Sequence, residues 1–211
     1  MACEKHPLAT GRGGLCPVCL LEEALAPDIA APPRRLTVHL PLGLTRSRSV
    51  FLVRQETPSV GLLRLKAWHQ RAPPDYLDRF HELQQGLARA DEAAIVSPLA
   101  ASVDASGWPS VLTEFRRGVP ILEAVGSGAL SSRAATALLA TLADVTRRAH
   151  ARGLAHGSLV SGNVIVRPDL TAAFLIDFGL SALLRLPSSP AAAATEDHAA
   201  LNTLLEAIRS L

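Results

Sequence analysis

The sequence predicts an α+β fold of two lobes, in which the strands come first and most of the helices follow. Alternating apolar and polar residues dominate residues 36–66, as expected for strands with one buried face. From residue 131 onward, apolar residues recur at helical spacing instead. All three cysteines lie within the first 19 residues, which marks a separate small unit at the start. A chain of 211 residues is long enough to bury a core in one or two domains.

The expected organisation follows these changes in composition. A Cys/His unit covers residues 1–26, and a proline-rich linker covers residues 27–35. A strand-rich lobe covers residues 36–117, and a shorter, mostly helical lobe covers residues 118–211.

In the strand-rich lobe, alternation and turn residues define the strands. Pro73 and Pro74 open a helix over residues 75–90, whose inward positions are expected to be Leu77, Phe80, Leu83 and Leu87. Strands are expected over residues 36–40, 50–53, 61–66, 95–103 and 109–115.

In the helical lobe, Ser131 or Ser132 is expected to cap a long helix that runs to about residue 152 and ends at Gly153. Two short strands follow, over residues 164–166 and 174–176. Residues 186–194, which are rich in Ser, Pro and Ala, are expected to form a loop. A final helix is expected over residues 195–211, with Thr195 as its N-cap and Asp197 in its first turn.

Composition excludes several classes of function. The net charge of +2 is too small to indicate nucleic acid as a partner. No apolar run approaches the roughly 20 residues of a membrane span, and no apolar leader follows Met1. The three cysteines leave none for disulfide bonds elsewhere. We therefore expect a cytoplasmic protein.

The N-terminal unit has the ligands of a structural zinc site. Cys3 and His6 form one pair, Cys16 and Cys19 form a second, and glycines connect the two. Two such turns can bring four side chains to one tetrahedral ion, with no open position for catalysis. Two alternatives remain, an unstructured segment with free thiols and a redox pair at Cys16 and Cys19.

Two motifs in the helical lobe carry the strongest functional signal. His156, Leu159 and Asn163 follow the spacing H-x-x-L-x-x-x-N, and Asp177-Phe178-Gly179 comes 14 residues after Asn163. Together they resemble the catalytic loop and the metal-binding turn of protein kinases, with the bacterial serine/threonine type most similar. The resemblance covers residues 36–211 and implies a two-lobed protein-kinase-like fold with a shortened C-lobe, preceded by a small zinc-ribbon-like unit. Similar Cys-Pro-x-Cys modules precede some bacterial kinase-like domains.

The resemblance also implies roles for individual residues. Lys66 corresponds to the lysine that contacts ATP phosphates, and Thr113 and Glu114 correspond to the hinge beside adenine. Asn163 and Asp177 correspond to the Mg²⁺ ligands. The residues expected to bind nucleotide are Gly43, Val50, Lys66, Glu114, Asn163 and Ile165.

The sequence departs from the kinase pattern around the same cleft. Ser158 replaces the catalytic aspartate, and Arg64 replaces the small residue that packs on adenine. Leu83 stands where the following helix should carry a glutamate, and it is expected to pack in the core. Thr45 and Arg48 replace two glycines of the phosphate-binding turn, so an ordinary hairpin is as good an interpretation there. No A-P-E motif follows Gly179.

These departures predict a pseudokinase, with no intact catalytic set. We expect a regulatory or scaffolding module in signalling that binds a protein partner, with structural zinc and residual binding of ATP and Mg²⁺. One alternative is an active phosphotransferase acting on protein or on a small molecule, since the motifs also resemble those of aminoglycoside phosphotransferases. Another is a zinc-anchored interaction module in which the kinase-like part is only a scaffold.

Overall fold

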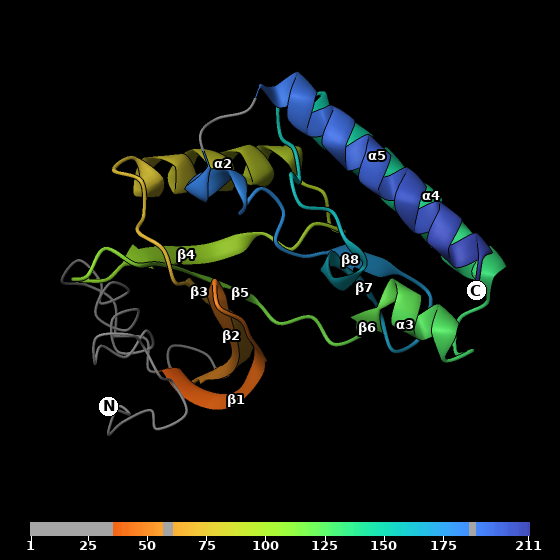
Figure 1. The fold of residues 1–211 in the computed structure, drawn as a ribbon, viewed down its shortest axis with the longest axis horizontal. Helices are drawn as coiled ribbons and strands as arrows, with labels where there is room; N and C mark the ends of the chain where they lie inside the picture. The colour runs from red at the N-terminus through yellow and green to blue at the C-terminus, as the bar shows by residue number, and fades with distance from the viewer. Residues whose placement is uncertain (1–35, 57–60, 186–188) are drawn as a thin grey trace. The chain divides into compact units, whose positions relative to one another are not determined.

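The computed structural model describes residues 36–56, 61–185 and 189–211 (Figure 1). The chain forms two compact units, each with its own hydrophobic core. The first unit contains the described residues up to Asp78 together with Pro98–Phe115. The second contains Arg79–Ser97 and Arg116–Leu211. The expected Cys/His unit and its linker, residues 1–26 and 27–35, lie outside the described residues.

The first unit is built on a five-stranded antiparallel sheet of order β1-β2-β3-β5-β4. All five strands were expected, and β1 continues four residues beyond the expected end, to Leu44. The mixed α+β class is therefore confirmed. The strands are β1 (Leu36–Leu44), β2 (Arg48–Gln55), β3 (Gly61–Trp68), β4 (Pro98–Val103) and β5 (Pro109–Glu114).

One face of this sheet forms the core of the first unit. Phe51 pairs with Leu65 and Val53 pairs with Leu63, so these four side chains lie on the same face. All four are buried, and they pack in one cluster with Leu112 of β5.

Helix α2 (Tyr76–Ala90) begins in the first unit and continues into the second. Its first turn buries Tyr76, whose hydroxyl donates to the Ser110 carbonyl at 3.1 Å. Burial raises the pKa of this phenol. The expectation that Leu77 faces inward is wrong, since Leu77 is 41% exposed. Tyr76 takes the buried position because it adds a hydrogen bond to its apolar contact.

The second unit combines helices with a small three-stranded antiparallel sheet of order β6-β7-β8. Ser131 caps α4 by accepting a hydrogen bond from the Ala134 N–H, and Gly153 adopts φ 77° just beyond its end, as expected. The elements are α3 (Ile121–Gly126), α4 (Ser132–His150), α5 (Pro190–Arg209), β6 (Val119–Pro120), β7 (Val164–Val166), β8 (Ala173–Leu175) and the 3₁₀ turns η2 (Ser161–Asn163) and η3 (Ala182–Leu184).

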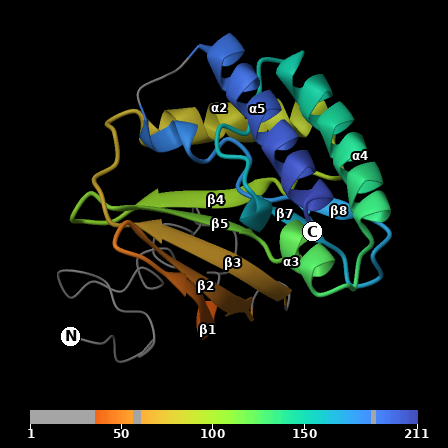
Figure 2. The same ribbon diagram turned by 45° about the vertical axis from the view of Figure 1, so that its right-hand side comes forward.

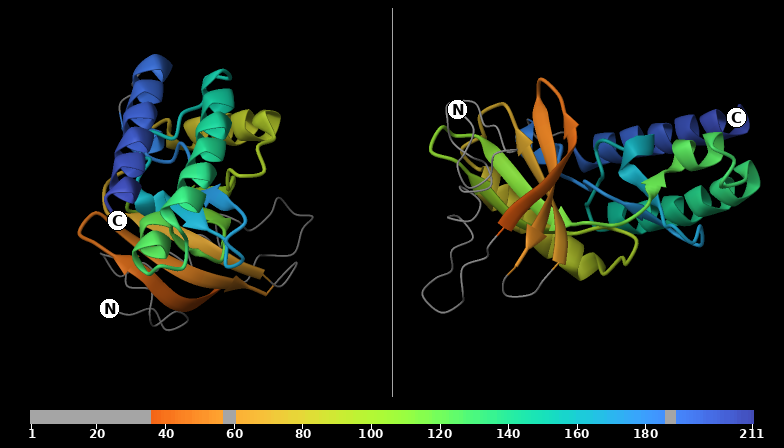
Figure 3. Two further views of the ribbon diagram at one scale, coloured as in Figure 1. Left: turned by 90° about the vertical axis from the view of Figure 1, so that its right-hand side faces the viewer. Right: turned by 90° about the horizontal axis from the view of Figure 1, so that it is seen from below.

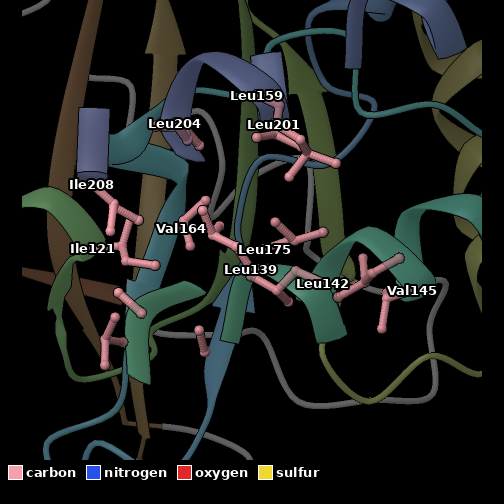
Figure 4. Packing of buried hydrophobic residues seen from close by; sticks show 14 of the residues in the cluster. Ile121, Leu139, Leu142, Val145, Leu159, Val164, Leu175, Leu201, Leu204 and Ile208 are labelled. Carbon is pink, nitrogen blue, oxygen red and sulfur yellow. The ribbon is translucent and has the colours of Figure 1, made fainter. Parts of the chain in front are cut away.

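Helices α4 and α5 lie side by side in this unit, as Figures 2 and 3 show. His150 at the end of α4 contacts Asp197 in the first half of α5, and the colours in Figure 2 show that the two helices run antiparallel. Their inward leucines, Leu139 and Leu142 on α4 and Leu201 and Leu204 on α5, belong to one core with the strands β7 and β8 (Figure 4). No helix in the described ranges is both long and apolar enough to cross a membrane.

The start of α5 corrects the sequence prediction. The helix begins at Pro190, with Ser189 as its N-cap, rather than at Thr195. Proline fits the first helical turn, where its missing N–H needs no partner, and the following alanines favour helix. Thr195 therefore lies inside the helix, where its hydroxyl donates to the Ala191 carbonyl. Asp197 does not belong to the first turn.

Candidate functional site

The loop that starts at His156 is held by one buried carboxylate. Asp197 Oδ2 accepts the His156 N–H at 2.7 Å, and Oδ1 accepts the Gly157 N–H at 2.9 Å. His150 Nε2 lies 2.9 Å from the same Oδ2. Asp197 is 1% exposed, and a carboxylate buried this deeply requires such donors. Sequence analysis missed this role, because it assigned Asp197 only to the first turn of the final helix.

The side chain of His156 connects this loop to the Asp-Phe-Gly turn. Its Nε2 lies 3.0 Å from the Ile176 carbonyl oxygen, and its ring lies 5.3 Å from the ring of Phe178. The Gly179 N–H donates back to the His156 carbonyl at 3.2 Å. His156 and Phe178 are both fully buried. The two motifs that are separated in the sequence therefore form one packed substructure.

Ser158 and Asn163 are ordered by a hydrogen bond within the loop. The Asn163 Nδ2 donates to the Ser158 carbonyl at 2.8 Å, and the Ile176 N–H donates to the Asn163 carbonyl at 3.0 Å. Among the described residues, Asn163 Oδ1 accepts no hydrogen bond. Asn163 is half-buried, so this amide oxygen is suited to contact a cation. Ser158 is also half-buried and brings no carboxylate to the loop.

Asp177 occupies a constrained position at the start of the turn. The residue is 5% exposed, and its backbone adopts φ 63°, in the left-handed region that few non-glycine residues enter. A conformation of this kind costs on the order of 1 kcal/mol or more and persists only where surrounding contacts enforce it. In the part of the chain that the structure describes, no group of three or more His, Cys, Asp or Glu residues forms a metal site.

Leu83 packs directly on this turn from α2. A methyl group added at Gly179 would come within 2.6 Å of Leu83 Cδ1, so the leucine covers the glycine closely. Leu83 also packs against the core of the second unit, as expected, while Glu82 is exposed. An apolar contact therefore stands where the resemblance places a glutamate.

Ile165 lies on the middle strand of the small sheet. It is 9% exposed and pairs with Pro120 on β6 and with Phe174 on β8. Gly118 approaches it closely, because a Cβ at Gly118 would lie 2.7 Å from Ile165 Cγ2. Arg116 stacks over Phe174 on the neighbouring strand, at 5.0 Å from the ring centroid.

In the first unit, Lys66 lies on a face of the sheet that also carries Val50. Lys66 pairs with Val50 on β2 and with Val111 on β5, and it is 7% exposed. Its Nζ lies 5.2 Å from the ring centroid of Trp68 on the same strand. Arg64, two residues earlier, shares this face. Glu114 is exposed at the end of β5.

The turn between β1 and β2 is a compact hairpin. The Thr45 N–H donates to the Arg48 carbonyl at 2.9 Å, and the Arg48 N–H donates to Thr45 Oγ1 at 3.1 Å. His69, just after the end of β3, holds the turn, because its N–H donates to the Ser47 carbonyl at 2.8 Å. Gly43 is exposed, and a Cβ there would meet no atom within 4 Å. The Thr45 hydroxyl oxygen thus accepts the Arg48 N–H, a donor that a bound phosphate would otherwise use.

The expected site residues are divided between the two units. Gly43, Val50, Lys66 and Glu114 belong to the first unit, whereas Ser158, Asn163, Ile165 and Asp177 belong to the second. The expected zinc ligands Cys3, His6, Cys16 and Cys19 lie outside the described residues.

Comparisons with known proteins support a kinase-like relationship. Over 119 residues the chain is 31% identical to the serine/threonine-protein kinase Pkn1 of Myxococcus xanthus. The similarity covers 54% of this chain but only 17% of the curated kinase that it matches. A scan against protein-family models finds no match.

Proposed function

We propose that this chain is a pseudokinase, a kinase-like domain without efficient phosphoryl transfer that acts as a regulatory or scaffolding module. The observation that carries the proposal is Ser158, which occupies the position of the catalytic aspartate. The loop around it is ordered, since Asn163 donates to its carbonyl and Asp197 holds the preceding backbone. A serine hydroxyl cannot accept the proton of a substrate hydroxyl near neutral pH.

Two further features support the proposal, because phosphoryl transfer depends on the positioning of phosphates and metal. At the position on α2 where the resemblance places a glutamate, Leu83 has no carboxylate and instead packs on Gly179. The β1–β2 turn is closed by Thr45 and held by His69, and the N–H groups of Thr45 and Arg48 already have acceptors within it. Each loss alone can be compensated, but together they remove most of the charge stabilisation.

The test is Mg²⁺-dependent turnover of ATP by the full chain. The matched control is Asp177→Asn, which removes the charge of the expected metal ligand and tolerates the left-handed backbone. We expect the wild-type rate to equal that of Asp177→Asn. A wild-type rate clearly above this control would refute the proposal.

A second candidate function is an active phosphotransferase that uses rearranged chemistry. Asn163 and Asp177 favour it, since both expected Mg²⁺ ligands are present and Asn163 keeps its amide oxygen available. The same experiment discriminates the two, because this function requires turnover that Asp177→Asn abolishes. Ser158→Asp adds the missing carboxylate. Under both candidate functions, this variant should turn over ATP faster than the wild type only if the chain binds ATP and Mg²⁺.

We also propose a structural zinc at Cys3, His6, Cys16 and Cys19, residual binding of ATP and Mg²⁺, a protein partner and a cytoplasmic location. The confinement of all cysteines to the first 19 residues supports a reducing compartment. If the zinc unit alone carries the interaction, Cys16→Ser should abolish partner binding. Intact binding by that variant would place the interaction in the kinase-like part.

A further inference from the structure

Three connecting segments meet at one end of the sheet in the first unit. Residues 45–47 join β1 to β2, residues 104–108 join β4 to β5, and residues 69–72 follow β3. The sheet is antiparallel in the order β1-β2-β3-β5-β4, so all three segments leave it at the same end. The exit of β3 lies between the two turns.

His69 contacts the turns on both sides of it. One ring nitrogen of His69 lies 3.1 Å from the Arg46 carbonyl oxygen, and the centroid of its ring lies 5.9 Å from that of Trp108. The Ala72 N–H donates to the Gly107 carbonyl at 2.8 Å, which ties the exit of β3 to the β4–β5 turn. Contacts within the first unit therefore hold the three segments together as one surface.

This surface carries three exposed arginines, Arg46, Arg48 and Arg71, and we call it the basic end. None of the three forms an ion pair with a residue that the structure describes. The stem of Arg71 lies along the β4–β5 turn, since a Cβ at Gly107 would be 3.8 Å from its Cγ. Asp104 is the single acidic residue of the three connecting segments, and its Oδ1 accepts two backbone N–H groups of its own turn. The basic end therefore keeps an excess of positive charge.

The two tryptophans of the chain both lie at the basic end. Trp108 is half-buried in the β4–β5 turn, and Trp68 is buried at the end of β3, where it pairs with Arg48. Solvated arginines are common on protein surfaces and indicate nothing by themselves. A partly exposed tryptophan beside arginines is more informative, because these two residue types are enriched among those that contribute most to binding at protein interfaces. Such an interface needs no cavity.

We propose that the basic end binds an acidic segment of the protein partner, in which aspartate or glutamate residues flank an apolar side chain. Arginine binds a carboxylate through two parallel N–H bonds, and the exposed part of Trp108 offers apolar contact between the charges. Exposed ion pairs are individually weak, so the arginines and the tryptophan must act together. The net charge of +2 provides no wide positive field for nucleic acid. The inference rests on the proposed scaffolding role, because it names the chemistry of the partner which that role requires.

The experiment titrates the full chain with three ligands. They are a glutamate-rich peptide that also contains leucine, the same peptide with glutamine in place of glutamate, and an oligothymidylate whose net charge equals that of the acidic peptide. Tryptophan fluorescence and calorimetry report binding, since both tryptophans lie at the basic end. We expect the acidic peptide to bind about tenfold more tightly than either other ligand, and its affinity to fall as salt is raised.

The double variant Arg46→Gln/Arg71→Gln removes two exposed cations and should weaken binding of the acidic peptide about tenfold. The matched control Arg133→Gln/Arg209→Gln removes the same charge from exposed positions on α4 and α5, and should bind as the wild type does. Equal losses in the two double variants, equal affinities for the two peptides, or tighter binding of the oligothymidylate would overturn the inference. ATP turnover above that of Asp177→Asn would refute the proposed function without changing these affinities, so the two proposals can fail separately.

Discussion

The two ring nitrogens of His156 have different surroundings in the core of the second unit. Nε2 lies 3.0 Å from the Ile176 carbonyl, whereas buried Nδ1 has no hydrogen-bond partner among the described residues. Since a carbonyl only accepts, Nε2 carries the proton in the neutral ring. A second proton on Nδ1 would be buried without an acceptor. Burial therefore lowers the pKa of His156, although the charges of Asp197 and Asp177 act in the opposite direction.

This lowered pKa predicts a loss of stability in acid. The unfolded chain protonates His156 near pH ~6.5, while the folded chain resists protonation to a lower pH. Acidification below that value therefore favours the unfolded state, by up to ~1.4 kcal/mol per pH unit. His156→Gln keeps an N–H for Ile176 and removes the titration, so its free energy of unfolding in urea should depend less on pH between ~7 and ~5.

His81→Gln is the control for this measurement, because His81 is exposed on α2. It should retain the pH dependence of the wild-type chain. If His156→Gln shows the same slope as His81→Gln, the neutral buried imidazole is not the source of the acid sensitivity.

At the scale of elements, Gly118 shows how one backbone position fixes the entry to β6. Its φ is 154°, and an added Cβ would lie 2.1 Å from the Val166 carbonyl oxygen. Such contact with backbone cannot be relieved by a side-chain rotation. Gly118→Ala should therefore lower the free energy of unfolding by about 2–4 kcal/mol. Gly126→Ala, at the end of α3 where a Cβ meets open space, should change it by less than ~1 kcal/mol. Urea denaturation of both variants checks this, and equal losses would contradict it.

The elements themselves follow mostly from local sequence. The alternation of apolar and polar residues encodes the five strands of the first sheet, and Ser131 encodes the capped start of α4. Both signals act over only a few residues. The start of α5 is different, because Ser189-Pro190 and Thr195 both satisfy the rules for a helix start. Asp197 must reach the His156 and Gly157 N–H groups 41 and 40 residues away, and no local rule contains that requirement.

At the scale of the whole molecule, residues 79–97 fold with the second unit although they precede β4 and β5 in the sequence. Leu83 packs on Gly179, and Gly86 lies so close to Leu154 that an added Cβ would come within 2.7 Å of it. Glu92 accepts two hydrogen bonds from Arg148, at 2.6 and 2.7 Å. The motifs of the candidate site were predictable because each is contiguous. These contacts were not, because each joins segments far apart in the sequence.

The distribution of cysteine over the whole chain makes the proposed zinc site directly measurable. All three thiols lie at Cys3, Cys16 and Cys19, so thiol chemistry on the full chain reports on that segment alone. If His6 completes a tetrahedral site, the purified chain should contain about one zinc per molecule, and its thiols should react with a thiol reagent only after a chelator removes the metal. Cys16→Ser should lose the zinc and expose its remaining thiols, whereas the control His39→Gln, in β1, should keep both properties. The wild-type chain purified in the presence of zinc could instead have three freely reactive thiols and no more bound zinc than Cys16→Ser. That result would mean that the segment is not a zinc site.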